Sequence, residues 1–174
     1  MKQNYNFTAF SMAIFSLYKK NNQLDVLYKE ARDFETLLND KYFFAFLTSY
    51  KISKEKTINF ISLNLKKYFS KYFLNFIFLI IEKNYFFYIK KINNYLLQLL
   101  IEALDIKKID VYLANNFSDE FIKKIILKEL SLKENYIFFK HIDKNLIGGY
   151  KIVFENKSYD KTVKSILHKM SDNF

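Results

Sequence analysis

The sequence predicts an α+β protein, with a six-helix bundle over residues 1–105 and a small mixed β-α-β-β-α domain over residues 106–174. Three observations predict this class. Apolar residues recur at helical spacing through the first hundred residues, and near Asp105 the spacing changes to the alternation typical of strands. The chain has no proline, and its only glycines, Gly148 and Gly149, are adjacent. A chain of 174 residues is long enough for two small domains.

The first three helices are predicted by rows of large apolar residues. Residues 7–17 carry an apolar stripe and a second apolar face, which is wider than one core contact requires. Asn22, with Asp25 three residues later, is expected to cap a second helix that ends near Leu38. A short apolar segment over residues 42–47 follows.

Three more helices complete the predicted bundle. Ser53 opens one of them, with Glu55 in the first turn, where a carboxylate suits the helix dipole. Residues 70–83 are apolar nearly all round, which predicts the most buried helix, and Asn84 is expected to begin the last long one. Six helical segments with short connections imply an up-and-down bundle.

The second domain follows from the change of period. Alternation over residues 108–114 predicts a strand, and Ser118 followed by two acidic residues predicts the start of a helix. Residues 135–142 and 149–156 predict two more strands. After a turn over residues 155–158, Asp160 is expected to cap a closing helix, whose apolar residues are Val163, Ile166, Leu167 and Met170.

The double glycine at the start of the third strand predicts a special backbone. Gly148 and Gly149 suit a positive φ, a bulge or the close approach of another backbone. A plain turn without any role toward a partner is the other interpretation.

Composition narrows the function classes. The net charge is +10, but of the 28 basic residues only Arg32 is arginine, the side chain whose planar fork grips phosphates and guanine edges. The abundance of lysine, asparagine and isoleucine is typical of an AT-rich genome, and a functional basic surface is the alternative explanation of the charge.

The absence of cysteine excludes disulfides and thiolate zinc sites, and an intracellular location fits this absence. The first 15 residues do not resemble a signal peptide, and the most apolar run, residues 72–81, is too short to span a membrane.

No motif predicts catalysis. The chain lacks the glycine-rich loops that cradle phosphates. His141 and His168 fall in separate elements without acidic residues at ligand spacing, and neither is placed to activate a serine or threonine. We therefore predict no enzyme activity, no catalytic residue, no metal site and no cofactor.

Two stretches leave open a different class of function. Residues 66–73 and 86–95 mix lysines with aromatic residues, as proteins that bind single-stranded nucleic acid do. The same stretches fit helices with buried aromatic residues and solvated lysines. A lysine-rich helical protein that binds nucleic acid or an anionic membrane surface is the alternative hypothesis.

Residues 141–167, HIDKNLIGGYKIVFENKSYDKTVKSIL, resemble the C-terminal signature of the delta subunit of F-type ATP synthase, called the oligomycin-sensitivity-conferring protein in mitochondria. The residues that match in order and spacing are Asp143, Leu146, Ile147, Gly148, Gly149, Asp160 and Val163. Thr162 keeps the hydroxyl of a family serine, whereas Lys161 stands where the family often has glycine.

Two other segments resemble the same family. Residues 10–28 are similar to its opening helices, with matches at Ala13, Phe15, Leu17, Leu24 and Asp25. Residues 74–86 resemble its fifth helix through Asn75, Ile81 and Glu82 but lack the Gly-Arg that ends that motif. The resemblance extends from about residue 7 to residue 170.

The resemblance implies a non-catalytic connector (stator) subunit of a hetero-oligomeric rotary ATPase. In the family, the N-terminal bundle receives amphipathic N-terminal helices of α subunits between its first and fifth helices, and the C-terminal domain holds a b-type peripheral stalk subunit. It also implies a peripheral location on the cytoplasmic face of the cell membrane, with contact to the membrane only through the complex and none to nucleic acid. The absent Gly-Arg leaves open a delta-like subunit of a specialised F1-like motor ATPase.

The resemblance also indicates candidate contact residues. Surplus apolar surface on soluble helices marks partner sites, and for the α-subunit helix we expect Phe10, Ala13, Leu17, Phe76 and Leu79. The alternative is that all five belong to the core. For the stalk side, or for the fold that supports it, the candidates are Ile147, Gly148, Gly149, Asp160 and Thr162.

Overall fold

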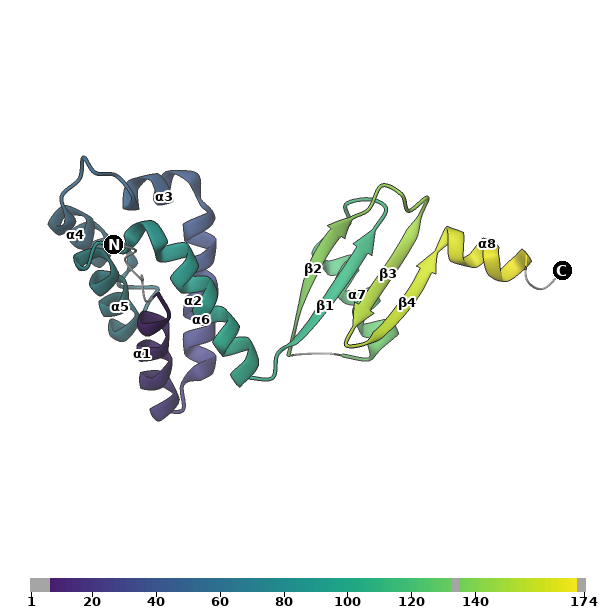
Figure 1. Cartoon of the computed structure of the whole chain (residues 1–174), viewed down its shortest axis with the longest axis horizontal. Helices are drawn as coiled ribbons and strands as arrows, with labels where there is room; N and C mark the ends of the chain where they lie inside the picture. The colour runs from purple at the N-terminus through teal and green to yellow at the C-terminus, as the bar shows by residue number, and fades with distance from the viewer. Residues whose placement is uncertain (1–6, 133–134, 172–174) are drawn as a thin grey trace, which may run out of the picture. The chain divides into compact units, whose positions relative to one another are not determined.

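The computed structural model describes residues 7–132 and 135–171, and the chain divides into two compact units, Met1–Leu104 and Asp105–Phe174 (Figure 1). Each unit has its own hydrophobic core. Helices form the first unit, and a four-stranded sheet with two helices forms the second. The predicted α+β class is therefore confirmed.

The described part of the N-terminal unit is built from helices. In order they are α1 (Phe7–Lys20), α2 (Leu24–Asn39), α3 (Lys41–Leu47), α4 (Lys54–Leu65), α5 (Lys71–Glu82), the 3₁₀ helix η1 (Phe86–Tyr88) and α6 (Ile89–Ala103). Helices α1 and α2 pack against α6, and α4 packs against α5. The stripes predicted from the sequence meet in this core, where the largest fully buried side chains include Leu27, Phe34, Ile61, Phe73, Ile77, Ile80, Ile92 and Leu96.

The helix ends follow their local sequence in some places and not in others. Ser53 caps α4 as predicted, because its hydroxyl accepts a hydrogen bond from the Lys56 N–H. The predictions for Asn22 and Asn84 are wrong. Both residues have a left-handed backbone, with φ of 53° and 62°, and they lie where α1 and α5 end instead of opening the next helix. Asparagine suits both places, because it caps helices and also tolerates positive φ.

The C-terminal unit is a mixed sheet with one helix against it. Its elements are β1 (Lys107–Leu113), α7 (Asp119–Leu130), β2 (Tyr136–Ile142), β3 (Gly149–Phe154), β4 (Lys157–Thr162) and α8 (Val163–Ser171). The strand order is β2-β1-β3-β4. The β1–β2 pair is parallel and so needs a crossover, which α7 supplies, whereas the other pairs are antiparallel.

One face of the sheet forms the core of this unit. The alternation along β1 buries Ile109, Val111 and Leu113, which pack with Ile122 and Ile126 of α7. The Ser118 hydroxyl caps α7 by accepting a hydrogen bond from the Phe121 N–H. The predicted first strand of this unit and the predicted start of α7 are thus confirmed.

The sequence prediction misses strand β4. It places a turn and a helix cap before Val163, but residues 157–162 pair with β3 along their whole length. The unit is therefore β-α-β-β-β-α instead of β-α-β-β-α. Asp160 lies within β4, and the cap of α8 is Thr162, whose Oγ1 accepts a hydrogen bond from the Ser165 N–H at 3.2 Å.

The double glycine stands where two backbones approach closely. Gly149, the first residue of β3, has φ of +83°, and a Cβ there would lie 2.2 Å from the Lys161 carbonyl oxygen. Gly148 accepts a hydrogen bond from the Val163 N–H through its carbonyl oxygen, and a Cβ there would lie 3.0 Å from Val163 Cγ2. The two glycines therefore join the start of β3 to the end of β4 and the start of α8.

Asp160 makes the stability of this junction sensitive to acid. Its carboxylate accepts a hydrogen bond from the Thr162 N–H at 2.9 Å, and hydrogen bonding by Thr162 holds the pKa of Asp160 below its ordinary value. A carboxyl with a lower pKa in the folded state adds stability above its unfolded pKa, about 4, and that stability is lost as the pH falls through the folded pKa.

We therefore expect the urea midpoint of the C-terminal unit to fall as the pH drops below about 4, and to fall less in Asp160→Asn. Asparagine keeps an acceptor oxygen but does not titrate. Hydrogen exchange of the β4 amides across this pH range reports the change. An identical pH profile in both proteins would contradict a role for Asp160.

Candidate partner-binding groove

An open apolar groove lies between α1 and α5. Its volume is about 380 Å³, and it is lined by Ala9, Phe10, Ala13, Ile14 and Leu17 of α1 and by Tyr72, Asn75, Phe76 and Leu79 of α5. No carboxylate, lysine or histidine is among these lining residues. The groove therefore suits an apolar ligand surface.

All five residues expected to contact an α-subunit helix line this groove: Phe10, Ala13, Leu17, Phe76 and Leu79. They differ in burial. Phe76 is 7% exposed and also belongs to the bundle core, whereas Leu17 and Leu79 are each 42% exposed at the rim. Ala13 is exposed, and Phe10 is half-buried.

The groove forms because each helix has two apolar faces. In α5, Phe73, Ile77 and Ile80 are fully buried in the bundle, at helical spacing. Phe76 and Leu79 lie on the side of the same helix that faces the groove. A helix with a single apolar stripe would bury that stripe in the core and would have no apolar side left to line a groove.

Sequence reasoning missed four lining residues: Ala9, Ile14, Tyr72 and Asn75. Ala9 stands one turn before Ala13, and Tyr72 and Asn75 precede Phe76 and Leu79 by one turn. Helical spacing from the predicted residues is the signal that identifies them. Tyr72 and Asn75 supply the polar groups at the groove.

A buried polar cluster links α1, α2 and the N-terminus of α5. The Tyr18 hydroxyl donates a hydrogen bond to Glu30 Oε2 at 2.7 Å, and the Ser70 N–H donates one to Glu30 Oε1. The Ser70 hydroxyl contacts both the Tyr18 hydroxyl and Glu30 Oε2. Burial raises the pKa of Tyr18 well above its ordinary value, the hydrogen bond with Ser70 lowers it, and Glu30 raises it further. Tyr18 therefore keeps its proton and remains a donor.

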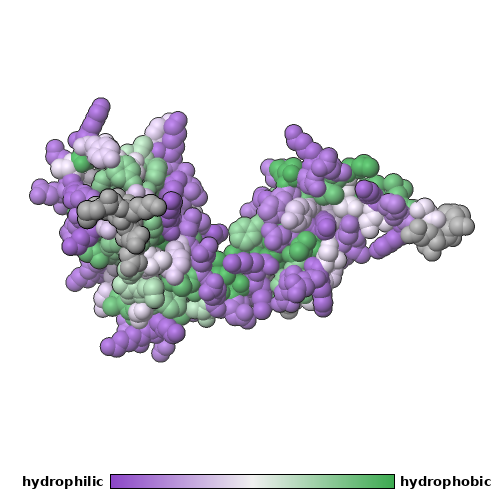
Figure 2. All heavy atoms as spheres, viewed as in Figure 1, coloured by the Kyte–Doolittle hydropathy of each residue, from purple (hydrophilic) through white to green (hydrophobic). Residues whose placement is uncertain are grey.

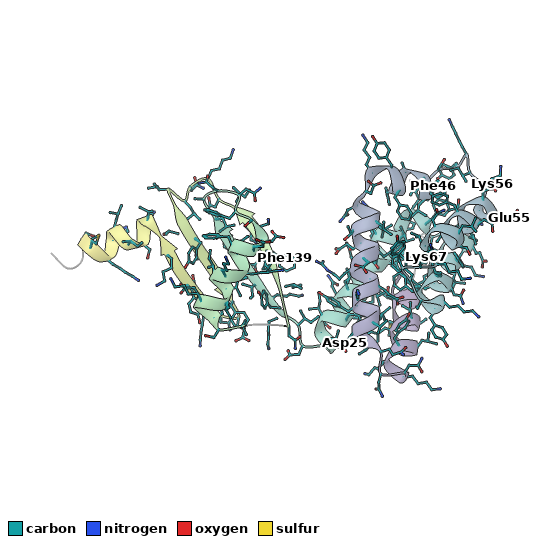
Figure 3. All side chains as sticks on the ribbon, turned by 180° about the vertical axis from the view of Figure 1, so that it is seen from behind. Asp25, Phe46, Glu55, Lys56, Lys67 and Phe139 are labelled. Carbon is teal, nitrogen blue, oxygen red and sulfur yellow. The ribbon has the colours of Figure 1, made fainter. Side chains whose placement is uncertain are left out.

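The first of the two mixed lysine and aromatic stretches is divided between core and solvent. In residues 66–73, Phe69 and Phe73 are buried, whereas Tyr68, Tyr72 and the three lysines are exposed. In residues 86–95 no aromatic side chain is fully buried. Hydrophilic side chains cover much of the visible face, with hydrophobic surface between them (Figure 2). Charged side chains such as Glu55, Lys56 and Lys67 are exposed on the surface of the N-terminal unit (Figure 3).

Four of the five candidate stalk-side residues meet at the β3–β4–α8 junction. Gly149 pairs with Thr162, Gly148 bonds to the start of α8, and Asp160 accepts the Thr162 N–H. Ile147 precedes the glycines and is 77% exposed. Gly148, Gly149, Asp160 and Thr162 thus shape the junction. Ile147, in contrast, presents an apolar side chain to solvent.

Helix α8 leaves its apolar stripe uncovered. Its apolar residues were predicted to close the domain, but α8 contains no buried residue. The exposed stripe consists of Val163, Ile166, Leu167 and Met170. Sequence reasoning found the stripe but not its exposure, because periodicity alone does not distinguish a core contact from a partner contact.

The histidines form no metal site within the part of the chain that the structure describes. His141 Nε2 lies 2.6 Å from Asp110 Oδ1 on the neighbouring strand, and its ring stacks on Tyr112. His168 lies in the last turn of α8. Groups of three or more metal-ligating side chains do not occur among the described residues.

Comparison with known proteins agrees with this architecture. The family model described as "ATP synthase delta (OSCP) subunit" matches residues 8–174. A protein named ATP synthase subunit delta from Wigglesworthia glossinidia brevipalpis is 30% identical over 98% of this chain and 96% of its own length. The protein of the same name from Mycoplasma pneumoniae is 25% identical, over 97% of both chains.

A solved structure shares the fold. One chain of the Toxoplasma gondii mitochondrial ATP synthase hexamer superposes with a TM-score of 0.58, covering 98% of this chain and 97% of that one, at 16% identity. Members of the matched family are non-catalytic subunits, as predicted here. Because the family model matches nearly the whole length of this chain, the chain belongs to the ATP synthase delta (OSCP) subunit family.

Proposed function

We propose that this chain is the connector (stator) subunit that tethers the catalytic α/β head of a rotary F-type ATP synthase to its peripheral stalk. The observation that carries the proposal is the open apolar groove between α1 and α5 in a chain of the delta family. An apolar groove without charged lining residues supports a binding role.

On the head side, an amphipathic N-terminal helix of an α subunit occupies the groove. Ala9 and Ala13 have small side chains one turn apart, so a helix approaches the α1 backbone closely. Leu17 and Leu79 at the rim then cover the apolar stripe of the partner helix. Burial of apolar surface at about 25 cal/mol per Å² drives this contact.

On the stalk side, the C-terminal unit holds a b-type stalk subunit through α8 and Ile147. The exposed stripe of α8 supplies the apolar contact, and Lys164, which is exposed on the same helix, favours acidic residues beside the partner's apolar stripe. Gly148, Gly149, Asp160 and Thr162 act by fixing the start of α8.

The proposed work is mechanical. Rotation within the head generates torque, and a head without a static tether would turn with the rotor. The chain resists that torque through two contacts, one on each unit, and it binds no nucleotide. Within the described residues, no helix has the length and apolarity to cross a membrane. In this proposal the chain reaches the cytoplasmic face of the membrane only through its complex.

Affinity purification of the tagged chain tests this function. We expect the α and β subunits and a stalk subunit to co-elute and to stay bound when salt rises from about 50 to 200 mM, because binding through apolar surface depends little on salt. Nucleic-acid binding through charge would weaken by about 10³–10⁵ over that range. Recovery of ribosomes or lipid alone would overturn the proposal.

The same experiment distinguishes two kinds of complex in which the connector subunit could work, an ATP synthase and a specialised motor. The family's Gly-Arg after the fifth helix is replaced here by other residues, which leaves room for a specialised F1-like motor as the second candidate. Co-elution of a membrane rotor ring supports an ATP synthase. Recovery of α and β subunits with a different attachment protein and no ring supports the specialised motor.

A further inference from the structure

We propose that Glu30 is a positioning residue for the groove: through Tyr18 and Ser70 it fixes the separation of α1 and α5 before a partner helix binds. Glu30 lies on α2 and is not among the lining residues of the groove. The proposal adds a supporting residue to the binding role proposed above and rests on that role for its functional meaning.

The first argument is the cost of burying this side chain. Glu30 is 6% exposed, and among the described residues no lysine, arginine or histidine forms an ion pair with it. A buried carboxylate is strongly unfavourable unless its oxygens accept hydrogen bonds. Glu30 accepts them from the Tyr18 hydroxyl and from the N–H and hydroxyl of Ser70. Its stability in the core therefore depends on both partners staying in place.

The second argument is where these partners lie. Tyr18 is on α1, next to the rim residue Leu17, and Ser70 is the N-cap of α5, two residues before the lining residue Tyr72. The Tyr18 ring also meets the Tyr72 ring edge-on, with centroids 6.3 Å apart. One carboxylate thus holds both walls of the groove, because a shift of either helix would leave a buried charge without its donor.

The third argument is that a neutral side chain holds the two walls less strongly. Glutamine has the size of Glu30 but only one acceptor oxygen, so if that oxygen accepts the Ser70 N–H, its NH₂ group faces the Tyr18 hydroxyl, which must then accept instead of donate. Two hydrogen bonds to a carboxylate are thereby replaced by weaker bonds between neutral groups. Glu30→Gln should therefore loosen the two walls. Tyr18→Phe removes the hydroxyl that joins α1 to Glu30 and Ser70, and it keeps the two bonds between Ser70 and Glu30.

Ser11→Ala is the matched control. Ser11 is another fully buried hydroxyl on α1, but it donates to the Ile92 carbonyl oxygen at 2.8 Å and so ties α1 to α6, away from the groove. Ser11→Ala and Tyr18→Phe each delete one buried hydroxyl of α1 together with its hydrogen bonds. Only Tyr18→Phe acts on the pair of helices that forms the groove.

The separation of the walls is measured in the free chain. The chain has no cysteine, so spin labels on Met12→Cys of α1 and Glu82→Cys of α5 are site-specific. We expect a broader distance distribution in Glu30→Gln and Tyr18→Phe and an unchanged one in Ser11→Ala. Equal distributions in all four proteins would overturn the inference without any reference to a partner.

Binding is measured with a synthetic peptide of the α-subunit N-terminus from the same organism, at a temperature where circular dichroism shows every variant folded. If about one molecule in ten keeps the groove at its binding width, the apparent Kd rises about tenfold in Glu30→Gln and Tyr18→Phe, with less than a twofold change in Ser11→Ala.

The double variant should bind no more weakly than Glu30→Gln alone, because both substitutions act on one cluster. Unchanged affinity in both single variants would contradict the inference. Failure of the unmodified chain to bind the peptide would contradict the proposed function instead, while the spin-label distances would still decide the role of Glu30.

Discussion

Replacing Gly149 with alanine is expected to unfold the C-terminal unit and to leave the N-terminal unit folded. The added Cβ would lie 2.2 Å from the Lys161 carbonyl oxygen and 2.9 Å from the Thr162 Cα. Both atoms belong to the backbone of β4, so no side-chain rotation relieves the overlap. The φ of +83° adds strain of about 1–3 kcal/mol, and overpacking adds about 1–3 kcal/mol more. Together these costs approach the whole stability of a small domain.

Gly148→Ala is the matched control for this prediction. A Cβ at that position would meet only Val163 Cγ2, at 3.0 Å, and Val163 is a partly exposed side chain that has room to move. We expect a loss of about 1 kcal/mol or less. Hydrogen exchange with mass spectrometry follows the two units separately in each variant. Equal protection of β3 and β4 in both variants would show that the close approach at Gly149 does not limit stability.

Leu79→Asp is expected to abolish binding of the α-subunit peptide at ordinary concentrations. Leu79 lies at the rim of the groove and is 42% exposed, so the free chain should remain folded. A bound helix would bury the new carboxylate among lining residues that include no cation. A penalty of about 2–4 kcal/mol corresponds to roughly 30- to 1,000-fold weaker binding. Calorimetric titration measures it directly.

Leu63→Asp separates this effect from a general effect of charge. Leu63 is on α4, is 82% exposed and is not among the residues that line the groove. The substitution changes the net charge by the same amount, so we expect a change in affinity of less than about twofold. An equal loss in both variants would mean that general electrostatic attraction, not the groove, holds the peptide.

Short-range signals predicted most of the fold. Helical spacing located the helices, and Ser53 and Ser118 were recognisable as caps because a cap depends on residues three positions away. Asn22 and Asn84 were misjudged because asparagine serves equally at either end of a helix. Strand β4 was missed because its residues are mostly polar, and its pairing depends on β3 instead of on its own pattern.

The groove was predictable in part. Phe10 and Leu17 follow from the apolar stripe of the first helix, and Ala13 follows from its second apolar face. Tyr72 and Asn75 do not follow from apolar spacing, because their side chains carry polar groups. The contacts of Glu30 span 12 and 40 positions along the sequence. No local pattern links residues so far apart, so this cluster becomes visible only once the helices are packed.

The uncovered stripe of α8 has a consequence for how a cell handles surplus copies. In a molecule synthesised without its partners, the apolar stripe stays exposed to solvent. Two such molecules can bury it by associating with each other. We therefore expect translation of this chain to be matched in stoichiometry to that of the other subunits. Orphan copies are expected to aggregate or to be degraded.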